Sequence, residues 1–258
     1  MKIKNNIFLV IFLINSLFIN KVFAEEKAIL NFEGDNWCPY TCEEKSEVGK
    51  GIFLEITELI FKNQNYTIHF EMMPWARVLK RGERGEIDGI IGAYKEGRNK
   101  FIFPNEPILQ STNSFLVRND SSWNFKDFNS LKSIHLGLIL GYIYGGNLEN
   151  IRKNAQKISE SGGENAIQKN LARLNGKEID ATLDEHNVLV YYINKMELNK
   201  SMKFVGDLGN KSGLYLGFPK EKPNSQKLAD IFDKGFIKLK KSSEYKKILN
   251  KYGITGKN

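Results

Sequence analysis

Residues 51–92 read GIFLEITELIFKNQNYTIHFEMMPWARVLKRGERGEIDGIIG, and this stretch decides the fold class. Apolar side chains recur at helical spacing over 51–62, whereas 66–71 alternates apolar and polar side chains as a half-buried strand does. Pro74 begins a second helical pattern, since a proline in the first turn loses no hydrogen bond, and 88–92 has the pattern of a short strand. Strands that alternate with amphipathic helices predict an α/β unit whose helices cover a sheet.

The same alternation extends on both sides of this stretch. A further strand is expected at 28–32, before the first helix. After residue 130 the pattern restarts, which predicts a second α/β unit. Its expected strands are 134–140, 157–159 and 179–183, its expected helices are 148–155, 166–174 and 188–194, and the chain then closes with a strand at 214–218 and helices at 225–239 and 243–252.

Two polar stretches, 119–130 and 200–213, lack a clean period and are candidate boundaries between the units. Two boundaries mean that the chain crosses twice between lobes, as a hinge with two strands requires. A ligand then binds in the cleft between the lobes. The expected division is a first lobe of 25–117 and 212–258, and a second lobe of 118–211.

Length and composition exclude several classes of protein. A chain of 258 residues with 41% hydrophobic residues, 26% charged residues and 6 prolines is globular, neither disordered nor collagen-like. The net charge of +8 raises the question of nucleic acid, but basic residues are scattered among acidic ones except near the C-terminus. The clustered lysines there are typical of solvated helix faces, although contact with anionic lipid headgroups or a membrane protein also fits them: Lys238, Lys240, Lys241, Lys246, Lys247 and Lys251. We therefore expect no nucleic-acid partner.

The N-terminal segment, residues 1–24, has the pattern of a secretory signal peptide. A basic start is followed by an apolar run over 7–19, and then by Val22 and Ala24 at the positions that suit a signal peptidase. An N-terminal membrane anchor is the alternative, but the run is shorter than the ~20 residues that a bilayer requires. Cleavage leaves a net charge of about +5 and predicts an exported mature chain that begins at Glu25.

Export changes the interpretation of the two cysteines. An extracytoplasmic compartment favours a local disulfide between Cys38 and Cys42, which would stiffen the segment that holds Trp37 and Tyr40; two reduced thiols are the alternative. The chain has three histidines, and none lies within zinc-ligand spacing of the pair: His69, His135 and His186. We therefore expect no metal site.

A series of short motifs resembles a known family. In chain order the motifs are Trp37-Cys38-Pro39-Tyr40, Gly51-Ile52, Pro74-Trp75-Ala76-Arg77, Gly85-Glu86-Ile87-Asp88, Gly92 through Arg98, Phe103-Pro104, Pro107, Gly137-Leu138, Gly141-Tyr142, Asn175 through Ala181, Tyr191-Tyr192, Leu214 through Phe218, and Ile248 through Gly253. Together they resemble the periplasmic solute-binding proteins of the polar amino acid type, extracellular solute-binding protein family 3. No single motif is specific, but the series covers nearly the whole mature chain in the right order.

This resemblance implies a fold and a function. The fold is the class II periplasmic-binding-protein fold, with two α/β lobes joined by a two-stranded hinge. The function is that of a periplasmic receptor, which captures a small polar solute, an amino acid or a derivative of one, and delivers it to a membrane ABC permease without turnover. We expect a monomer that needs no cofactor.

The resemblance also implies which residues bind an α-amino acid. Arg98 is similar to the arginine that binds the carboxylate, because a planar guanidinium forms two parallel hydrogen bonds to it; a surface arginine is the alternative. Glu185, with Asp184 second, is similar to the acidic residue that binds the ammonium group. Asp184 equally fits the cap of the helix that follows.

Aromatic and basic residues complete the expected site. Trp37 and Trp75 match positions that line the cleft in relatives, where they supply apolar area and stack on planar or cationic groups; core packing is the alternative. Arg77 fits either a second anion contact or an ion pair with Glu71 or Glu86. Tyr142 lies at a strand-to-helix turn that can receive a carboxylate.

Two departures from the family pattern leave the ligand open. The segment 88–98 is about two residues shorter than in relatives, and Ala93-Tyr94 replaces a threonine-containing segment that bonds the carboxylate.

Two functions other than transport are also possible on this fold. One is an enzyme on the same fold, similar to the cyclohexadienyl or arogenate dehydratases, with Glu185 as a general acid whose pKa burial raises. The other is a ligand-binding sensory module.

Overall fold

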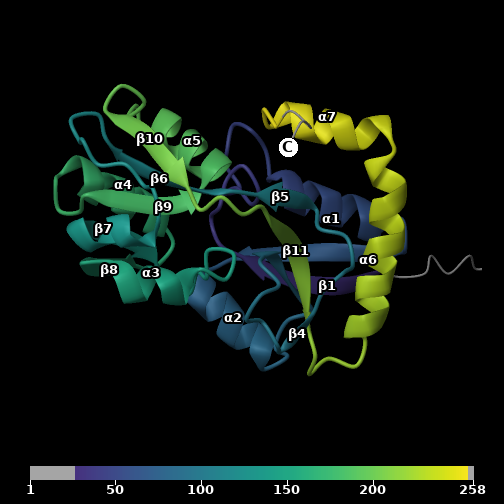
Figure 1. The fold of residues 1–258 in the computed structure, drawn as a ribbon. Coiled ribbons are helices and arrows are strands. Elements are labelled where there is room, and N and C mark those ends of the chain that lie inside the picture. Colours follow the sequence, from purple (N-terminus) through teal and green to yellow (C-terminus); the bar gives the residue numbers. More distant parts are fainter. Residues whose placement is uncertain (1–26, 255–258) are drawn as a thin grey trace, which may run out of the picture.

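The computed structural model describes residues 27–254, so the expected signal peptide at 1–24 lies outside the described residues. The chain forms two lobes that lie side by side, each built on one β-sheet with helices packed against it (Figure 1). Within the described residues, no helix is both long and apolar enough to cross a membrane.

The first lobe contains a six-stranded sheet with the order β2-β1-β3-β11-β4, in which β5 also pairs with β11. Its strands are β1 (Ala28–Gly34), β2 (Tyr66–Met72), β3 (Gly89–Ala93), β4 (Phe101–Ile102), β5 (Leu109–Ser111) and β11 (Ser212–Pro219). Strands β1, β2 and β3 are parallel, and β11 returns antiparallel to β3. Parallel strands require crossover helices, and the expected helices supply them.

Four helices cover this sheet: α1 (Ile52–Lys62), α2 (Trp75–Glu83), α6 (Ser225–Lys240) and α7 (Ser243–Lys251). Helix α1 buries Ile52, Phe53, Ile56 and Ile60, which is the apolar stripe expected from the sequence. Behind it, Phe32 and Phe61 pack with Phe218 and Phe232 in one aromatic cluster. Burial of each ring stabilises the fold by about 1.5–3 kcal/mol, which makes this cluster the rigid base of the lobe.

The second lobe contains a five-stranded sheet with the order β10-β6-β9-β7-β8. Its strands are β6 (Asn113–Arg118), β7 (His135–Ile139), β8 (Lys157–Ser161), β9 (Ala181–Glu185) and β10 (Met202–Asp207), and its helices are α3 (Leu148–Asn154), α4 (Ala166–Asn175), α5 (His186–Lys195) and the short 3-10 helix η1 (Phe128–Ser133). The expected helices and strands are all present, and β6 and β10 are additional.

The chain crosses between the sheets twice, from β5 to β6 and from β10 to β11. Strand β6 pairs with β9 and β10, so the expected first-lobe limit at residue 117 is corrected: the second sheet begins at Asn113. Of the two polar stretches, 119–130 is not a crossing, whereas 200–213 contains one at 208–211. The stretch 119–130 packs Trp123 and Phe125 against Phe115 of the second lobe, and 200–213 contains β10.

The ends of several strands meet between the lobes. Asp35 follows β1, Tyr94 follows β3, Gly141 follows β7, and Asp184 lies at the end of β9. In sheets with parallel strands, ligands bind outside the carboxyl ends of the strands, because the loops there are free to carry polar side chains. The fold therefore places one candidate site in the space between the two lobes.

Candidate ligand-binding site

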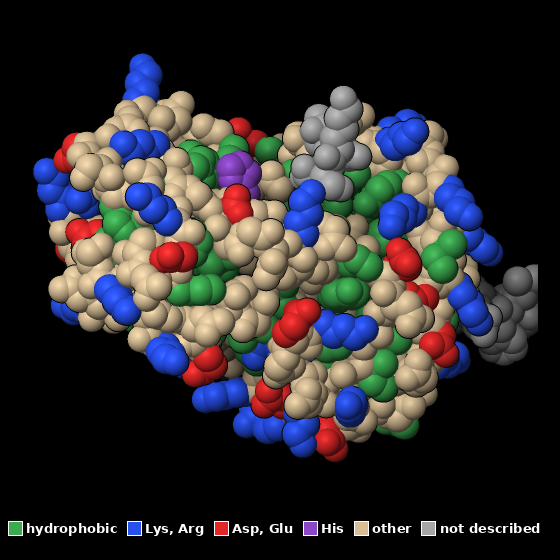
Figure 2. All heavy atoms as spheres, viewed as in Figure 1, with side chains coloured by type: hydrophobic (Ala, Val, Ile, Leu, Met, Phe, Trp, Pro, Cys, Tyr) green, Lys and Arg blue, Asp and Glu red, His purple; other side chains and the backbone are tan. Residues whose placement is uncertain are grey.

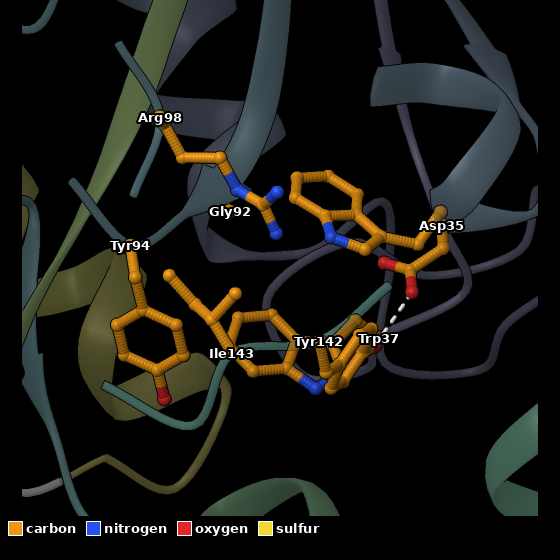
Figure 3. A pocket seen from close by; sticks show the side chains of 8 residues that line it. Asp35, Trp37, Gly92, Tyr94, Arg98, Tyr142 and Ile143 are labelled. Atoms are coloured by element: carbon orange, nitrogen blue, oxygen red, sulfur yellow. Dashed lines mark hydrogen bonds between the residues drawn. The ribbon is translucent and has the colours of Figure 1, made fainter. Parts of the chain in front are cut away.

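A pocket with a cavity volume of about 20 Å³ lies between the lobes. Loops that follow β1, β3 and β7 and the start of α2 form its wall. The lining residues are Asp35, Trp37, Trp75, Gly92, Tyr94, Arg98, Tyr142 and Ile143 (Figure 3). This space holds about one water molecule, so in this closed form a ligand as large as an amino acid requires the lobes or the lining side chains to move apart.

Three hydrogen bonds join the lobes around this pocket. The Tyr142 hydroxyl donates to Asp35 Oδ2 at 2.6 Å (dashed in Figure 3). The Trp37 Nε1–H donates to Asp184 Oδ1 at 3.1 Å, and an Arg98 N–H donates to the Gly141 carbonyl at 2.7 Å. Each bond connects a residue of the first lobe with one of the second, so the structure is a closed form.

Arg98 supplies the positive charge in the pocket. Its guanidinium points into the pocket beside the aromatic side chains (Figure 3), and burial lowers the pKa of Arg98. Its buried Nε–H has no hydrogen-bond partner among the described residues. A carboxylate could therefore accept two hydrogen bonds from Arg98, as in a bidentate pair. One would come from this Nε–H, and the other from the N–H that now donates to the Gly141 carbonyl.

Two buried carboxyl groups, Asp35 and Asp184, supply negative charge from opposite lobes. Burial raises the pKa of Asp35 to about 6 and the pKa of Asp184 to about 7, despite the hydrogen bonds that each accepts. Asp184 Oδ2 is buried without a hydrogen-bond partner among the described residues. A buried carboxylate gains stability from a cation beside it, so both groups suit a positively charged ligand.

Three aromatic side chains form the wall between these charges. Tyr142 packs edge-to-face between the two indoles, with ring centroids 6.3 Å from Trp37 and 6.4 Å from Trp75. Gly92 makes room for the Trp37 ring: its φ is +89°, and a Cβ atom there would lie 3.3 Å from Trp37 Cε3. Aromatic faces of this kind attract planar cations.

Glu185 has a different position from the one that the resemblance implies. Its carboxylate caps α5 by accepting from the Val188 N–H at 3.0 Å, and it is absent from the pocket lining. Burial raises the pKa of Glu185 to about 8. The cap of α5 is thus Glu185 and not Asp184. Asp184 instead accepts a hydrogen bond from Trp37 in the pocket wall.

Arg77 also lies away from the pocket. Its side chain is exposed on α2, and the lining residues do not include it. The expected ion pair with Glu71 or Glu86 is not among the ion pairs of residues 27–254; instead Arg81 lies 3.1 Å from Glu33 and 3.5 Å from Glu86. Over the same part of the chain, no group of His, Cys, Asp or Glu side chains is arranged to hold a metal ion.

The disulfide between Cys38 and Cys42 is present, as expected. It closes the loop within a segment, residues 35–46, that we call the clasp because its side chains contact the second lobe at several points. Beyond the Asp35 and Trp37 bonds, Asn36 accepts from Tyr192, Tyr40 accepts from Asn187 at 3.0 Å, and Glu43 pairs with Lys195. The disulfide thus constrains the segment that makes most of the interlobe contacts described here.

We therefore predict that the C38S/C42S variant binds ligand about tenfold more weakly than the parent protein. Without the crosslink, the clasp must be ordered when the lobes close, and fixing the backbone of even one residue costs about 1–2 kcal/mol. Calorimetric titration measures the affinity, and thermal unfolding without ligand measures stability, which should fall by no more than a few degrees because the closed loop is short. Unchanged affinity would show that the clasp is rigid without its disulfide.

Four lining residues are not among the expected site residues: Asp35, Gly92, Tyr94 and Ile143. Two of them, Asp35 and Tyr94, bring polar groups to the pocket. Tyr94 is buried, and its hydroxyl bonds Ser111 at 2.9 Å and receives the Asn113 amide at 3.0 Å, so it fixes the floor of the pocket beside the hinge. A signal for both existed: each directly follows a strand of the parallel part of the first sheet, where ligand-binding loops lie.

Comparisons with known proteins show the family of this chain. The family model for bacterial extracellular solute-binding proteins, family 3, matches residues 33–255. The chain is 28% identical over 215 residues to the arginine-binding periplasmic protein of Mannheimia haemolytica, covering 81% of this chain and 84% of the relative.

Solved structures show the same fold at lower identity. An ancestral arginine-binding protein bound to arginine is 20% identical, with a TM-score of 0.75 over 88% of this chain and 99% of that one. A histidine kinase sensor domain with similarity to periplasmic binding proteins is 18% identical, with a TM-score of 0.76 over 88% of this chain and 97% of that one. With the family match covering most of its length, this chain belongs to the bacterial extracellular solute-binding proteins, family 3.

Proposed function

We propose that this protein is a periplasmic receptor for a cationic α-amino acid, with L-arginine as the best candidate, and that it delivers this ligand to an ABC permease. The observation that carries the proposal is the charge at the pocket: Asp35 and Arg98 line it, and Asp184 lies behind its wall, where it accepts from Trp37. With both carboxyl groups ionised, this set has a net charge of −1. An amino acid with a cationic side chain has a net charge of +1 and therefore balances it.

Each group of the ligand then has a partner. Arg98 binds the carboxylate through its unpartnered Nε–H and a second N–H. Asp35 and Asp184 bind the two cationic groups, and Asp184 Oδ2 gains the partner that it lacks. The faces of Trp37 and Trp75 hold a planar guanidinium better than a compact ammonium, because a guanidinium stacks on aromatic rings.

Ligand capture follows from contacts with both lobes. In the closed form the lobes are joined by Tyr142–Asp35 and Trp37–Asp184, and a ligand in the pocket would lie against Asp35 and against the Trp37 side chain that Asp184 holds. A ligand shifts the equilibrium between open and closed forms only by its differential affinity for the closed form. Binding to Asp35 in one lobe and Asp184 in the other supplies that difference.

Transport is favoured over the enzyme alternative by the position of Glu185. A dehydratase similar to those on this fold would need an acid in the cleft. Glu185, the residue expected in that role, caps α5 and is absent from the pocket lining, and Asp35, the acid that does line the pocket, accepts from Tyr142. The Mannheimia haemolytica relative is a binding protein by its name. Incubation with prephenate should therefore yield no phenylpyruvate, as absorbance would report.

The proposal predicts that affinity for L-arginine rises with pH. The pKa of Asp35 is about 6 and that of Asp184 about 7 without ligand, and a bound cation lowers both, so binding releases protons. Between pH 5 and pH 8 we expect the affinity to increase by at least tenfold. The ligand-free protein should show the opposite trend: its stability falls as pH rises from about 4 to about 7, because ionising these buried carboxyl groups is unfavourable.

Calorimetric titrations at pH 5, 6, 7 and 8 measure the first trend, and melting temperatures without ligand measure the second. The D35N variant is the matched control, because it removes one of the two titrating groups and should flatten the pH dependence of binding. A pH-independent affinity in the parent protein would contradict the assignment of these two carboxyl groups to the ligand cation.

A thermal-shift screen of the mature protein tests the proposed function. The panel contains L-arginine, L-lysine, L-glutamine, L-glutamate, opines, polyamines, small organic acids and short peptides. A ligand at a hundredfold excess over Kd stabilises the folded state by about 2.7 kcal/mol, which gives a clear increase in melting temperature. The largest increase is expected with L-arginine. A larger one with an organic acid or a neutral amino acid would contradict the proposal.

A further inference from the structure

The net charge of the described chain is concentrated in its C-terminal part. Residues 220–254 contain ten lysines and four acidic residues, a net charge of +6, whereas residues 27–219 contain twenty-four basic and twenty-four acidic residues. The first 193 of the described residues are therefore neutral as a whole. All of the excess positive charge belongs to α6, α7 and the turns that flank them.

Four of these lysines lie on one side of α6. Lys227, Lys234, Lys238 and Lys241 follow one another at intervals of seven, four and three residues, which places them on the same face of a helix. We call this set the lysine face. All four side chains are exposed, and within residues 27–254 none of them forms an ion pair. Figure 2 shows blue side chains along the right-hand edge, where α6 runs in Figure 1.

The acidic residues of this region do not neutralise the lysine face. Asp233 is buried and accepts hydrogen bonds from the Asn105 backbone and side chain. Asp230 accepts from Gln226 on its own helix, and Glu244 lies 3.9 Å from Lys247. The lysine face consequently keeps its charge, which attracts anions in solution.

Apolar side chains lie beside these lysines. Ile237 is 47% exposed, one of the most exposed large apolar side chains in the described chain. A groove between α1, α6 and the start of α7 is lined by Leu59 and Ile231 together with Lys234 and Lys238. Lysines interspersed with exposed aliphatic side chains on one helix are typical of surfaces that rest on a lipid bilayer.

We propose that the lysine face of α6 binds the anionic lipid headgroups of the membrane. The face is extended, since its four lysines span fourteen residues or about 21 Å of helix, and a planar array of negative charge can engage all of them together. A single acidic residue of a protein partner would engage only one. The anionic bilayer surface is therefore the occupant that this geometry fits best.

This binding is compatible with ligand capture. Helix α6 packs on α1, α7, β4 and β11, all of the first lobe, and lies on the side of that lobe away from the second lobe (Figure 1). The pocket lies between the lobes, so the lysine face can rest on a membrane while the second lobe moves. Attachment would keep the receptor near the membrane, where its permease lies under the proposed function.

Vesicle flotation of the mature protein tests this inference. Vesicles of 70% phosphatidylcholine and 30% phosphatidylglycerol are compared with vesicles of phosphatidylcholine alone, at 50 mM and 300 mM NaCl. We expect the partition coefficient to be at least tenfold higher on the anionic vesicles at low salt, and this difference to be lost at high salt. Equal binding to both kinds of vesicle, no binding to either, or binding that salt does not weaken would overturn the proposal.

Two matched variants test the location. K227E/K234E/K238E/K241E reverses the lysine face, whereas K126E/K132E/K153E/K157E reverses four exposed lysines of the second lobe and changes the net charge equally. The first variant should lose at least a hundredfold in partition coefficient, and the second no more than a few-fold. A milder K227Q/K234Q/K238Q/K241Q variant serves if the first does not fold, as circular dichroism would show. An equal loss in both sets would overturn the assignment to α6.

Discussion

Replacement of Arg98 by alanine should abolish measurable binding of L-arginine, with a loss of about two to three orders of magnitude in affinity. The guanidinium of Arg98 is the positive group that the pocket presents to a carboxylate, and its Nε–H has no other partner among the described residues. Removing one member of a buried ion pair costs about 3–5 kcal/mol, because the remaining charge is left desolvated. Calorimetric titrations of L-arginine into R98A and into the parent protein measure this loss of affinity.

Two further variants separate charge from geometry. R77A removes an exposed arginine of α2 that lies outside the pocket lining, so its affinity should equal that of the parent protein. R98K keeps the charge but loses the planar fork, and it should recover only part of the affinity. The melting temperature of ligand-free R98A should change little, since the hydrogen bond lost is the one to the Gly141 carbonyl. Retained affinity in R98A would remove Arg98 from the site.

Replacement of Asp35 or Asp184 by asparagine should change which ligand the protein prefers. D35N and D184N are nearly isosteric, and each removes one negative charge from the pocket. The affinity for L-arginine should fall by about a hundredfold, since a charged hydrogen bond in a buried site is worth about 2–3 kcal/mol. One of these two carboxyl groups is proposed to bind the guanidinium of the ligand side chain. In the variant that lacks this carboxyl group, L-citrulline, the uncharged isostere of L-arginine, should bind about as well as L-arginine does.

The matched control for this pair is E185Q. A glutamine at position 185 can still accept from the Val188 N–H and cap α5, so ligand affinity should stay within a few-fold of the parent value. The opposite pattern, in which E185Q abolishes binding and D184N does not, would return the role of ammonium partner to Glu185, as the family resemblance implies.

Most of the fold follows from the sequence because its elements are long and strongly periodic. Helix α1 and strands β1, β2 and β3 lie where the apolar spacing places them. Strands β6 and β10 escape prediction for a physical reason. The β10 segment contains Gly206 and lies among Asn, Gly and Lys residues typical of a linker, and it becomes a strand because it pairs with β6, which is more than eighty residues away in the chain.

The sequence likewise predicts some residues of the site and leaves others undecided. Arg98, Trp37, Trp75 and Tyr142 line one pocket, and each follows or begins an element that the sequence predicts. The choice between Asp184 and Glu185 could not be made from the sequence. Neighbouring residues at the end of a strand point to opposite sides, so a shift of one residue in register exchanges a pocket group for a helix cap.

Calorimetric titration of L-arginine into the mature protein at pH 8, with L-citrulline as the matched ligand, tests the central claim most directly. The two ligands have the same shape and differ in the positive charge of the side chain, which is the feature that Asp35 and Asp184 are proposed to recognise. We expect one site per chain, micromolar or tighter affinity for L-arginine, and binding of L-citrulline at least a hundredfold weaker. Equal affinity for the two ligands, or no binding of L-arginine, would contradict it.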